Sequence, residues 1–150
     1  MTLSAKARVR ALPSRRFVLT HLEESLAPDR RPGLMRYIET QVDILFAEER
    51  AVADLTGAVD LAAACAWMSK ACAFSVLSMG ADGVVIFRNG EQTFGPPAPH
   101  FEIAPYRYAD GFLDALEQGH DLESCALMAS RAAADVATEI RRLARTSASR

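Results

Sequence analysis

The chain has 150 residues, of which 50% are hydrophobic and 24% are charged, and its net charge is −2. A chain of this length forms one domain with a sizeable core, and the composition is that of an ordinary globular protein. The balanced charge predicts no nucleic-acid partner. No apolar run approaches the roughly 20 residues that span a bilayer, so we expect a cytoplasmic protein without a membrane partner.

Basic residues gather near both ends of the chain. Residues 1–16 contain one lysine and four arginines but no acid, and four arginines follow Glu139. A phosphate-binding arm is one interpretation, and solvated chain ends are the simpler one. We therefore divide the chain into a basic N-terminal arm at 1–14, one domain at 15–144 and a frayed tail at 145–150.

Metal and nucleophile motifs are absent from the sequence. Cys65, Cys72 and Cys125 lack C-x-x-C spacing, which predicts reduced, mostly buried thiols. The three histidines are scattered and form no zinc pattern. The phosphate loop, the nucleophile elbow and the dinucleotide glycine motif are also missing. These patterns alone define a globular domain without an assigned chemistry.

The first third of the chain alternates between strand and helix patterns. A short apolar run at 17–20 predicts a buried strand, and the 3–4 spacing of apolar residues at 30–40 predicts an amphipathic helix. Residues 42–47 are rich in strand formers. A helical pattern then continues through Leu55, and Gly57 is a typical helix stop.

The middle of the chain changes from helix to strand periodicity. A helical stripe covers 61–68, and Asn89-Gly90 is typical of a two-residue hairpin turn. Turn residues separate several short runs that we predict to be strands. These runs are 73–77, 84–87, 92–94 and 101–103.

The last third returns to helix. Tyr108, Phe112 and Leu116 recur at every fourth position and predict a helix that Gly119 ends. Asp121 is a candidate N-cap for a final helix. The expected buried face of that helix consists of Leu122, Cys125, Ala129, Ala132 or Ala133, Val136 and Ile140. Alternation of helices and strands along the whole chain implies an α/β layer fold with a partly parallel sheet.

Several segments, in this order, resemble the ribokinase (PfkB) family of kinases. R-R-F-V-L-T at 15–20 resembles the opening strand of the C-terminal half of bacterial adenosine kinases. V-D-I-L-F-A-E-E-R-A at 42–51 resembles the family's V-D-I-L-F-A-N-E-x-E, and L-S-M-G-A-D-G at 77–83 resembles its T-x-G-x-x-G loop. Residues 111–125 are similar to the helix pair after the family's catalytic loop. The resemblance spans about residues 15–140.

The resemblance implies a partial ribokinase-like fold with a mostly parallel sheet, a β-hairpin and flanking helices. It also implies the nucleotide-binding half of a kinase that transfers phosphate from ATP, with Mg²⁺, to a sugar or nucleoside hydroxyl. In such kinases a D-T-x-G-A-G-D segment supplies backbone N–H groups to the phosphate and an Asp as base, and an N-x-x-E motif organises the metal. The candidate positions are Asp110 for the catalytic base and Ser78, Gly80, Gly83 and Ser130 for the nucleotide. Glu49, next to the N-x-x-E position of Glu48, is the candidate that would compensate at the metal.

The sequence departs from the family at both catalytic motifs. Where the glycine-rich loop is expected, either the anion hole is deleted or Tyr106, Arg107 and Tyr108 occupy its glycine positions. Bulky side chains disfavour the positive-φ turn and crowd a phosphate. Glu48 and Ala51 stand at the Asn and Glu of N-x-x-E. We therefore interpret the chain as truncated and divergent, with little or no phosphotransferase activity of its own.

Each assigned residue also has a purely structural interpretation. Gly80 and Gly83 fit ordinary turn glycines, Ser130 a small packing residue and Asp110 a helix N-cap. The alternative function is a non-catalytic interaction or oligomerisation module. Half of a parallel sheet leaves an unpaired edge, which a second copy or a partner carrying the missing half would cover. A decaying gene product that folds poorly is a third interpretation.

Overall fold

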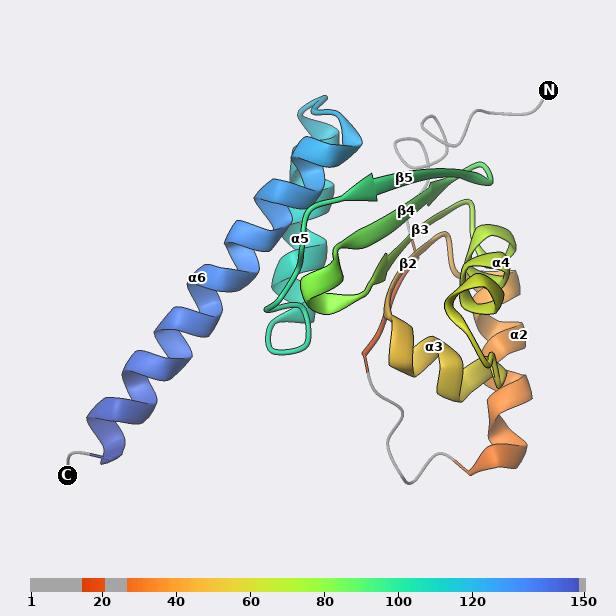
Figure 1. Cartoon of the computed structure of the whole chain (residues 1–150), viewed down its shortest axis with the longest axis horizontal. Coiled ribbons are helices and arrows are strands. Elements are labelled where there is room, and N and C mark those ends of the chain that lie inside the picture. Colours follow the sequence, from red (N-terminus) through yellow and green to blue (C-terminus); the bar gives the residue numbers. More distant parts are fainter. Residues whose placement is uncertain (1–14, 21–26, 149–150) are drawn as a thin grey trace.

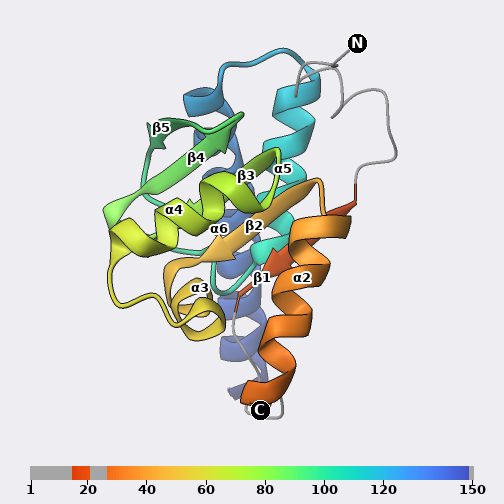
Figure 2. The same ribbon diagram turned by 90° about the vertical axis from the view of Figure 1, so that its right-hand side faces the viewer.

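The computed structural model describes residues 15–20 and 27–148, so the predicted basic arm lies outside the described residues. One sheet has helices on both of its faces (Figure 1, Figure 2). The strands are β1 (Arg16–Leu19), β2 (Ile44–Glu48), β3 (Phe74–Ser78), β4 (Val84–Arg88) and β5 (Glu91–Gly95). The helices are α2 (Arg31–Gln41), α3 (Glu49–Thr56) and α4 (Leu61–Ala71) on one face, and α5 (Pro105–Glu117) and α6 (Leu122–Ala148) on the other. Short 3₁₀ helices cover Pro28–Arg30 and Gly80–Asp82.

The sheet combines a parallel part with an antiparallel part. Its strands lie in the order β1-β2-β3-β4-β5, with β1, β2 and β3 parallel and β3, β4 and β5 antiparallel. Asn89 and Gly90 have φ angles of 53° and 82° in the β4–β5 turn, as a two-residue hairpin turn requires. The predicted α/β layered fold with a hairpin is confirmed.

The two central parallel strands are buried on both faces. Phe46 and Phe74 point into the core under α5 and α6, whereas Leu45 and Leu77 point into the core under α2, α3 and α4. Strands covered on both sides are apolar at consecutive positions, which explains the unbroken run at 44–47. The charged residue of these two strands, Glu48, therefore stands at a strand end.

Aromatic rings fill the core under α5 and α6. Phe112 packs edge-to-face on Phe46 and on Phe74, with ring centroids 5.7 Å apart in each pair. Phe101 packs on Tyr108 in the same manner at 5.2 Å. Such pairs add about 0.5–1.5 kcal/mol each beyond their burial. The start of α5 and the loop before it are thus fixed to the sheet.

The predicted helices and strands are confirmed, except that residues 101–103 form no strand and one residue predicted to be buried is exposed. Residues 101–103 form turns rather than a strand. Phe101, which made this run look like a strand, is apolar because it is buried in the core. Ile140, predicted to be buried, is 48% exposed. The last helix continues to Ala148, and the domain boundary at residue 144 stays a prediction. Asp121 is confirmed as its N-cap, since its side chain accepts a hydrogen bond from the Ser124 N–H at 2.8 Å.

The cysteines are free, as predicted. Cys72 and Cys125 are buried, and Cys65 is half-buried. Burial raises the pKa of Cys72 to about 12, with smaller contributions from Asp43 and Glu39. The thiolate is therefore scarce at neutral pH and the group unreactive.

No single helix in the described part of the chain has the length and apolar composition to cross a membrane. Only α3 and α4 taken together have that length and composition, and this pair is bent by 84°.

The contact between α5 and α6 depends on a glycine. A Cβ at Gly111 would lie 3.0 Å from the Ala132 Cβ and 3.2 Å from the Ala129 Cα, whereas a Cβ at Gly33 in α2 would meet nothing within 4 Å. We expect Gly111→Val to lower the free energy of unfolding by about 1–3 kcal/mol through overpacking. Gly33→Ala should raise it, by up to about 1 kcal/mol, through helix propensity. Urea denaturation of both variants measures these changes, and equal effects would contradict the close packing.

Candidate functional site

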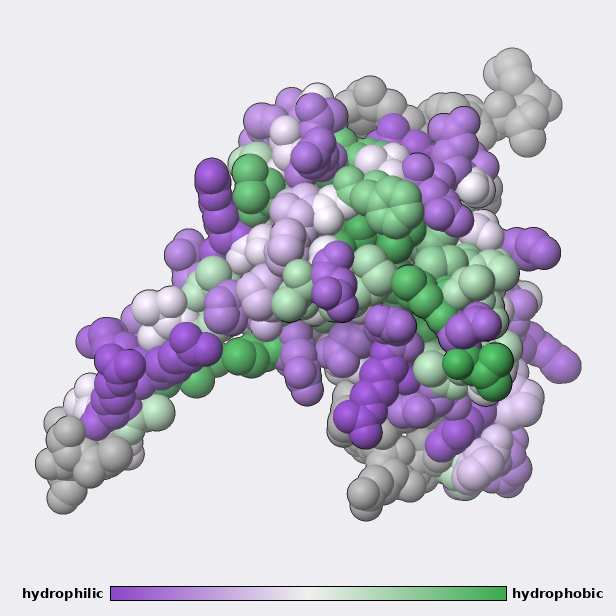
Figure 3. Space-filling model, viewed as in Figure 1, coloured by the Kyte–Doolittle hydropathy of each residue, from purple (hydrophilic) through white to green (hydrophobic). Residues whose placement is uncertain are grey.

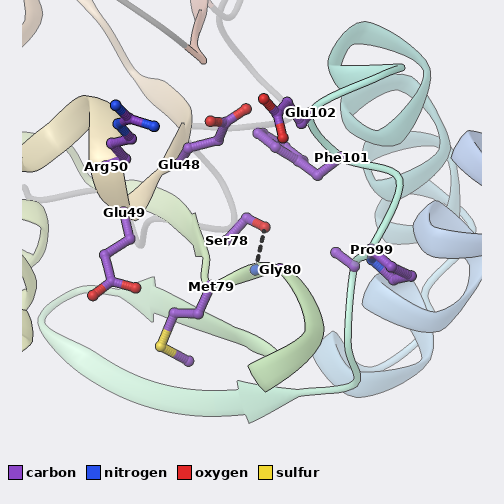
Figure 4. Close-up of a pocket in the computed structure, with 10 residues that line it drawn as sticks. Glu48, Glu49, Arg50, Ser78, Met79, Gly80, Pro99, Phe101 and Glu102 are labelled. Carbon is purple, nitrogen blue, oxygen red and sulfur yellow. Dashed lines mark hydrogen bonds between the residues drawn. The ribbon is translucent and has the colours of Figure 1, made fainter.

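A pocket lies at the carboxyl ends of β2 and β3, the edge at which α/β sheets bind ligands. Its volume is about 280 Å³. The lining comes from the β2–α3 junction, the turn after β3 and the loop before α5 (Figure 4). The lining residues are Glu48, Glu49, Arg50, Ser78, Met79, Gly80, Ala98, Pro99, Phe101 and Glu102. We call this the sheet-end pocket.

Carboxylates dominate the charge of the sheet-end pocket. Glu48, Glu49 and Glu102 line it together with one guanidinium, that of Arg50. Glu48 and Glu102 lie on the same side of the pocket, while the Glu49 side chain points away from both (Figure 4). Within residues 15–20 and 27–148, no three His, Cys, Asp or Glu side chains converge as metal ligands. The metal role of Glu49 therefore remains a prediction.

The turn after β3 uses its polar groups to hold its own shape. The Gly80 N–H donates to the Ser78 hydroxyl at 3.2 Å, and the Gly80 carbonyl accepts from the Ala98 N–H at 2.9 Å. Ser78 and Gly80, both predicted to contact nucleotide, thus lie together in the pocket. Their hydrogen bonds with each other and with Ala98 leave few backbone donors for a phosphate.

Gly83 does not line the sheet-end pocket. Its φ is 107°, and a Cβ there would lie 2.8 Å from the Gly95 carbonyl oxygen. A side chain would therefore collide with the backbone of β5. This contact provides a structural reason for the glycine, whatever its part in ligand binding.

Ser130 lies behind the pocket rather than in it. Its hydroxyl on α6 donates to the Pro97 carbonyl at 3.0 Å. The neighbouring Ala98 and Pro99 line the pocket, so this bond attaches one pocket wall to α6. The hydroxyl hydrogen of Ser130 is thus taken by the Pro97 carbonyl, and its contact with a nucleotide stays a prediction.

The predicted base, Asp110, lies in a different place. Its Oδ1 is 2.8 Å from Nη1 of Arg16, the first residue of β1, and both side chains are about half exposed. The two residues line a second pocket of about 390 Å³ with Phe17, Val18, Tyr106 and Ala109. The two pockets share no lining residue. Asp110 is also inside α5 rather than at its N-cap, which is Ala104, so the N-cap interpretation is wrong.

Large side chains occupy the start of α5, which one of the two predicted placements aligns with the family's glycine positions. Tyr108 is completely buried, and burial raises the pKa of its hydroxyl, which has no hydrogen-bond partner among the described residues. Tyr106 is 69% exposed. Pro105 is the first residue of the helix and supplies no N–H. This helix start is thus filled by a core ring and lacks one backbone donor.

The sequence did not single out six pocket residues: Arg50, Met79, Ala98, Pro99, Phe101 and Glu102. Arg50 and Met79 directly follow residues assigned by resemblance. Their position just after a predicted strand would have indicated that they lie at the pocket. Phe101 and Glu102 come to the pocket only through the turns before α5. No local pattern predicts such a path.

Comparison with known proteins identifies the fold. No protein-family model matches the chain, and no curated protein matches it by sequence. A probable sugar kinase from Rhizobium etli CFN 42 matches with a TM-score of 0.67 and 24% identity, over 86% of this chain and 40% of the kinase. Adenosine kinase from Sinorhizobium meliloti matches with a TM-score of 0.64 and 20% identity, over 87% of this chain and 42% of the adenosine kinase. Fructokinase from Vibrio cholerae O395 matches with a TM-score of 0.65 and 16% identity, over 89% of this chain and 50% of the fructokinase.

These similarities define the fold of the chain as that of ribokinase-type (PfkB) sugar and nucleoside kinases. The predicted resemblance is thereby confirmed at the level of structure. The chain spans 40–50% of the length of the kinases that it matches. At these identities, the likeness establishes the fold and leaves the chemistry to be argued from the site.

The two glycines of the β3–β4 turn differ in what an added methyl group would meet. Gly83→Ala places a Cβ against the Gly95 backbone, whereas a Cβ at Gly80, with φ of 62°, meets nothing within 4 Å. We expect Gly83→Ala to lower stability by about 1–3 kcal/mol and Gly80→Ala by about 1 kcal/mol. Thermal unfolding of the two variants tests this order, and a larger loss at Gly80 would refute the explanation.

Proposed function

We propose that this chain is a nucleotide-side portion of a ribokinase-type kinase fold that binds nucleosides weakly and transfers no phosphate by itself. The observation that carries the proposal is the separation of the predicted site residues. Ser78, Gly80 and Glu49 line the sheet-end pocket, whereas Asp110 pairs with Arg16 in the second pocket. A general base must reach the proton that it abstracts, at about 2.6–3.2 Å.

The place of the sheet-end pocket supports ligand binding. It lies where parallel strands end and where the sheet changes from parallel to antiparallel. A matched fructokinase has been crystallised with fructose, ADP and calcium ion, which supports a nucleotide as ligand class for this fold. The volume of about 280 Å³ suits one ring system rather than a whole nucleoside triphosphate.

The charge of the pocket favours an uncharged ligand. Three carboxylates and one guanidinium give an excess of negative charge, which repels a triphosphate. The hydrogen bond from Gly80 to Ser78 removes a donor that a phosphate would need. We therefore propose that adenosine binds more tightly than ATP.

A non-catalytic interaction module is the second candidate function. Its support is an apolar face of α6 that continues past the body of the protein, where Ile140 and Leu143 are 48% and 55% exposed. β1 also ends the sheet among the described residues, with Phe17 and Val18 only partly buried. Exposed apolar faces of this kind mark contacts with other chains.

The absence of phosphate transfer is tested by an enzyme assay. We expect no ATP-dependent phosphorylation of adenosine or ribose above the uncatalysed rate, because Asp110, the residue predicted as the base, lines the second pocket and not the sheet-end pocket. Asp110→Asn should be indistinguishable from the wild type. Turnover that Asp110→Asn abolishes would overturn the proposal.

The charge of the pocket gives a prediction for affinity. Replacing Glu49 and Glu102 by glutamine should raise the affinity for ATP several-fold at low salt, because repulsion of the phosphates falls, and leave that for adenosine nearly unchanged. Glu117→Gln, which removes an exposed carboxylate at the far end of α5, is the matched control. Ligand-detected NMR measures both affinities, and equal gains for adenosine and ATP would contradict the electrostatic explanation.

A further inference from the structure

The outer edge of β1 carries hydrogen-bonding groups that β2 does not use. Among the described residues β1 is the outermost strand on the parallel side of the sheet, with α2 on one face and α5 on the other (Figure 2). The Arg15 carbonyl accepts from the Ile44 N–H at 3.3 Å, which fixes the phase of the β1–β2 ladder. Alternate residues of an edge strand bond to the same neighbour, so the backbone groups of Phe17 face β2 and those of Arg16 and Val18 face outward.

Aromatic rings stand beside this edge on the α2 face. Phe17 points to that face, and its ring packs edge-to-face on Tyr37 of α2 with the ring centroids 6.0 Å apart. Phe17 is only partly buried, and Tyr37 is 46% exposed. Both rings would lose contact with water if another apolar surface came against the edge.

The α5 face of the edge carries balanced charge. Val18 points to this face and lines the second pocket, together with Tyr106. The Arg16 guanidinium lies 2.8 Å from Asp110, so no net charge repels an approaching strand. Tyr106 is 69% exposed, and the pocket beside it has a volume of about 390 Å³, which is large enough to receive a ring.

The direction of α5 makes this edge complementary to itself. The helix begins just after the loop that lines the carboxyl ends of β2 and β3, and its Asp110 reaches Arg16 at the amino end of β1. Tyr106, one turn before Asp110, therefore lies towards the carboxyl end of β1. A two-fold axis through the edge reverses this order in a second copy. The ring of Tyr106 in each copy then lies opposite the charged pair of the other, which favours a second copy as the occupant of the edge.

We propose that two copies of this chain pair through β1 as antiparallel strands, which joins their sheets into one. The outward-facing groups set the register: Arg16 of each copy pairs with Val18 of the other, and Phe17 meets its own equivalent on the two-fold axis. No arginine then lies opposite another. The Tyr106 ring of one copy packs on the guanidinium of the other, and its hydroxyl donates to the Asp110 carboxylate there.

This arrangement uses each β1 edge once and closes without further growth. The inference rests on the second candidate function, for which it names the partner, and it is independent of nucleoside binding.

Cysteine cross-linking tests the register. Phe17→Cys places two thiols across the axis, where the Cα atoms of a non-hydrogen-bonded antiparallel pair lie about 4.5 Å apart, within disulfide range. Under mild oxidation this variant should form a covalent dimer on a non-reducing gel. Val18→Cys is the matched control, because its equivalent lies two residues, roughly 7 Å, further along the partner strand. It should form little covalent dimer. Both variants are made in a Cys65→Ser background, since Cys65 is the half-buried native thiol.

A proline in the edge gives a second measurement. The Val18 N–H faces outward, so Val18→Pro removes a donor from the seam between copies and none from the β1–β2 ladder. Light scattering after size-exclusion chromatography should show a wild-type dimer. Val18→Pro should weaken that dimer at least on the order of tenfold, because two hydrogen bonds are lost and the rings clash with the partner strand.

Leu143→Ser is the matched control for this measurement. Leu143 is 55% exposed on the projecting end of α6, where Figure 3 shows a further apolar surface. The substitution should leave the dimer intact, because that end of α6 projects away from β1 (Figure 1). A dimer that Leu143→Ser abolishes would assign the contact to α6 and overturn the proposal.

Three other results would also overturn it: a monomeric wild type, equal cross-linking of Phe17→Cys and Val18→Cys, or a dimer that survives Val18→Pro. Circular dichroism shows whether each variant folds, and the cross-linking result decides if Val18→Pro does not. All measurements are made without nucleotide, so a failed dimer and a failed nucleoside site give separate results.

Discussion

The burial of β2 and β3 on both faces is the constraint from which the rest of the structure follows. Their side chains alternate between two cores, one under α2, α3 and α4 and one under α5 and α6. A strand covered in this way cannot place a charge along its length without desolvating it. Charged groups are therefore displaced to the strand ends, where Glu48 terminates β2 beside Ser78 at the end of β3. The sheet-end pocket is the result.

The same constraint explains why the predicted site residues are divided between two places. Ser78 and Gly80 follow a buried strand and so reach its carboxyl end. Asp110 is inside a helix, and its direction is set by the residues of α5 that the core buries, Tyr108 and Phe112. With these two rings against the sheet, Asp110 faces Arg16 at the start of β1.

The sheet-end pocket, with three carboxylates and one arginine, differs chemically from a site that binds phosphate groups. Backbone N–H groups and cations stabilise phosphoryl oxygens, and the start of α5 offers few of them after Pro105 and the buried ring of Tyr108. The carboxylates around the pocket instead favour positive or uncharged groups.

The sequence by itself determined the elements, because its periodicities are local. Strand runs, the Asn89-Gly90 turn, the Asp121 cap and the order of family-like segments all depend on residues near one another in the chain. Only the tertiary structure decided which of these residues meet. The path of 101–103 through the core, the pairing of Asp110 with Arg16 and the exposure of Ile140 depend on contacts between segments far apart in sequence. An apolar residue at helical spacing is buried only where another element covers it, and no element of the described chain covers the end of α6.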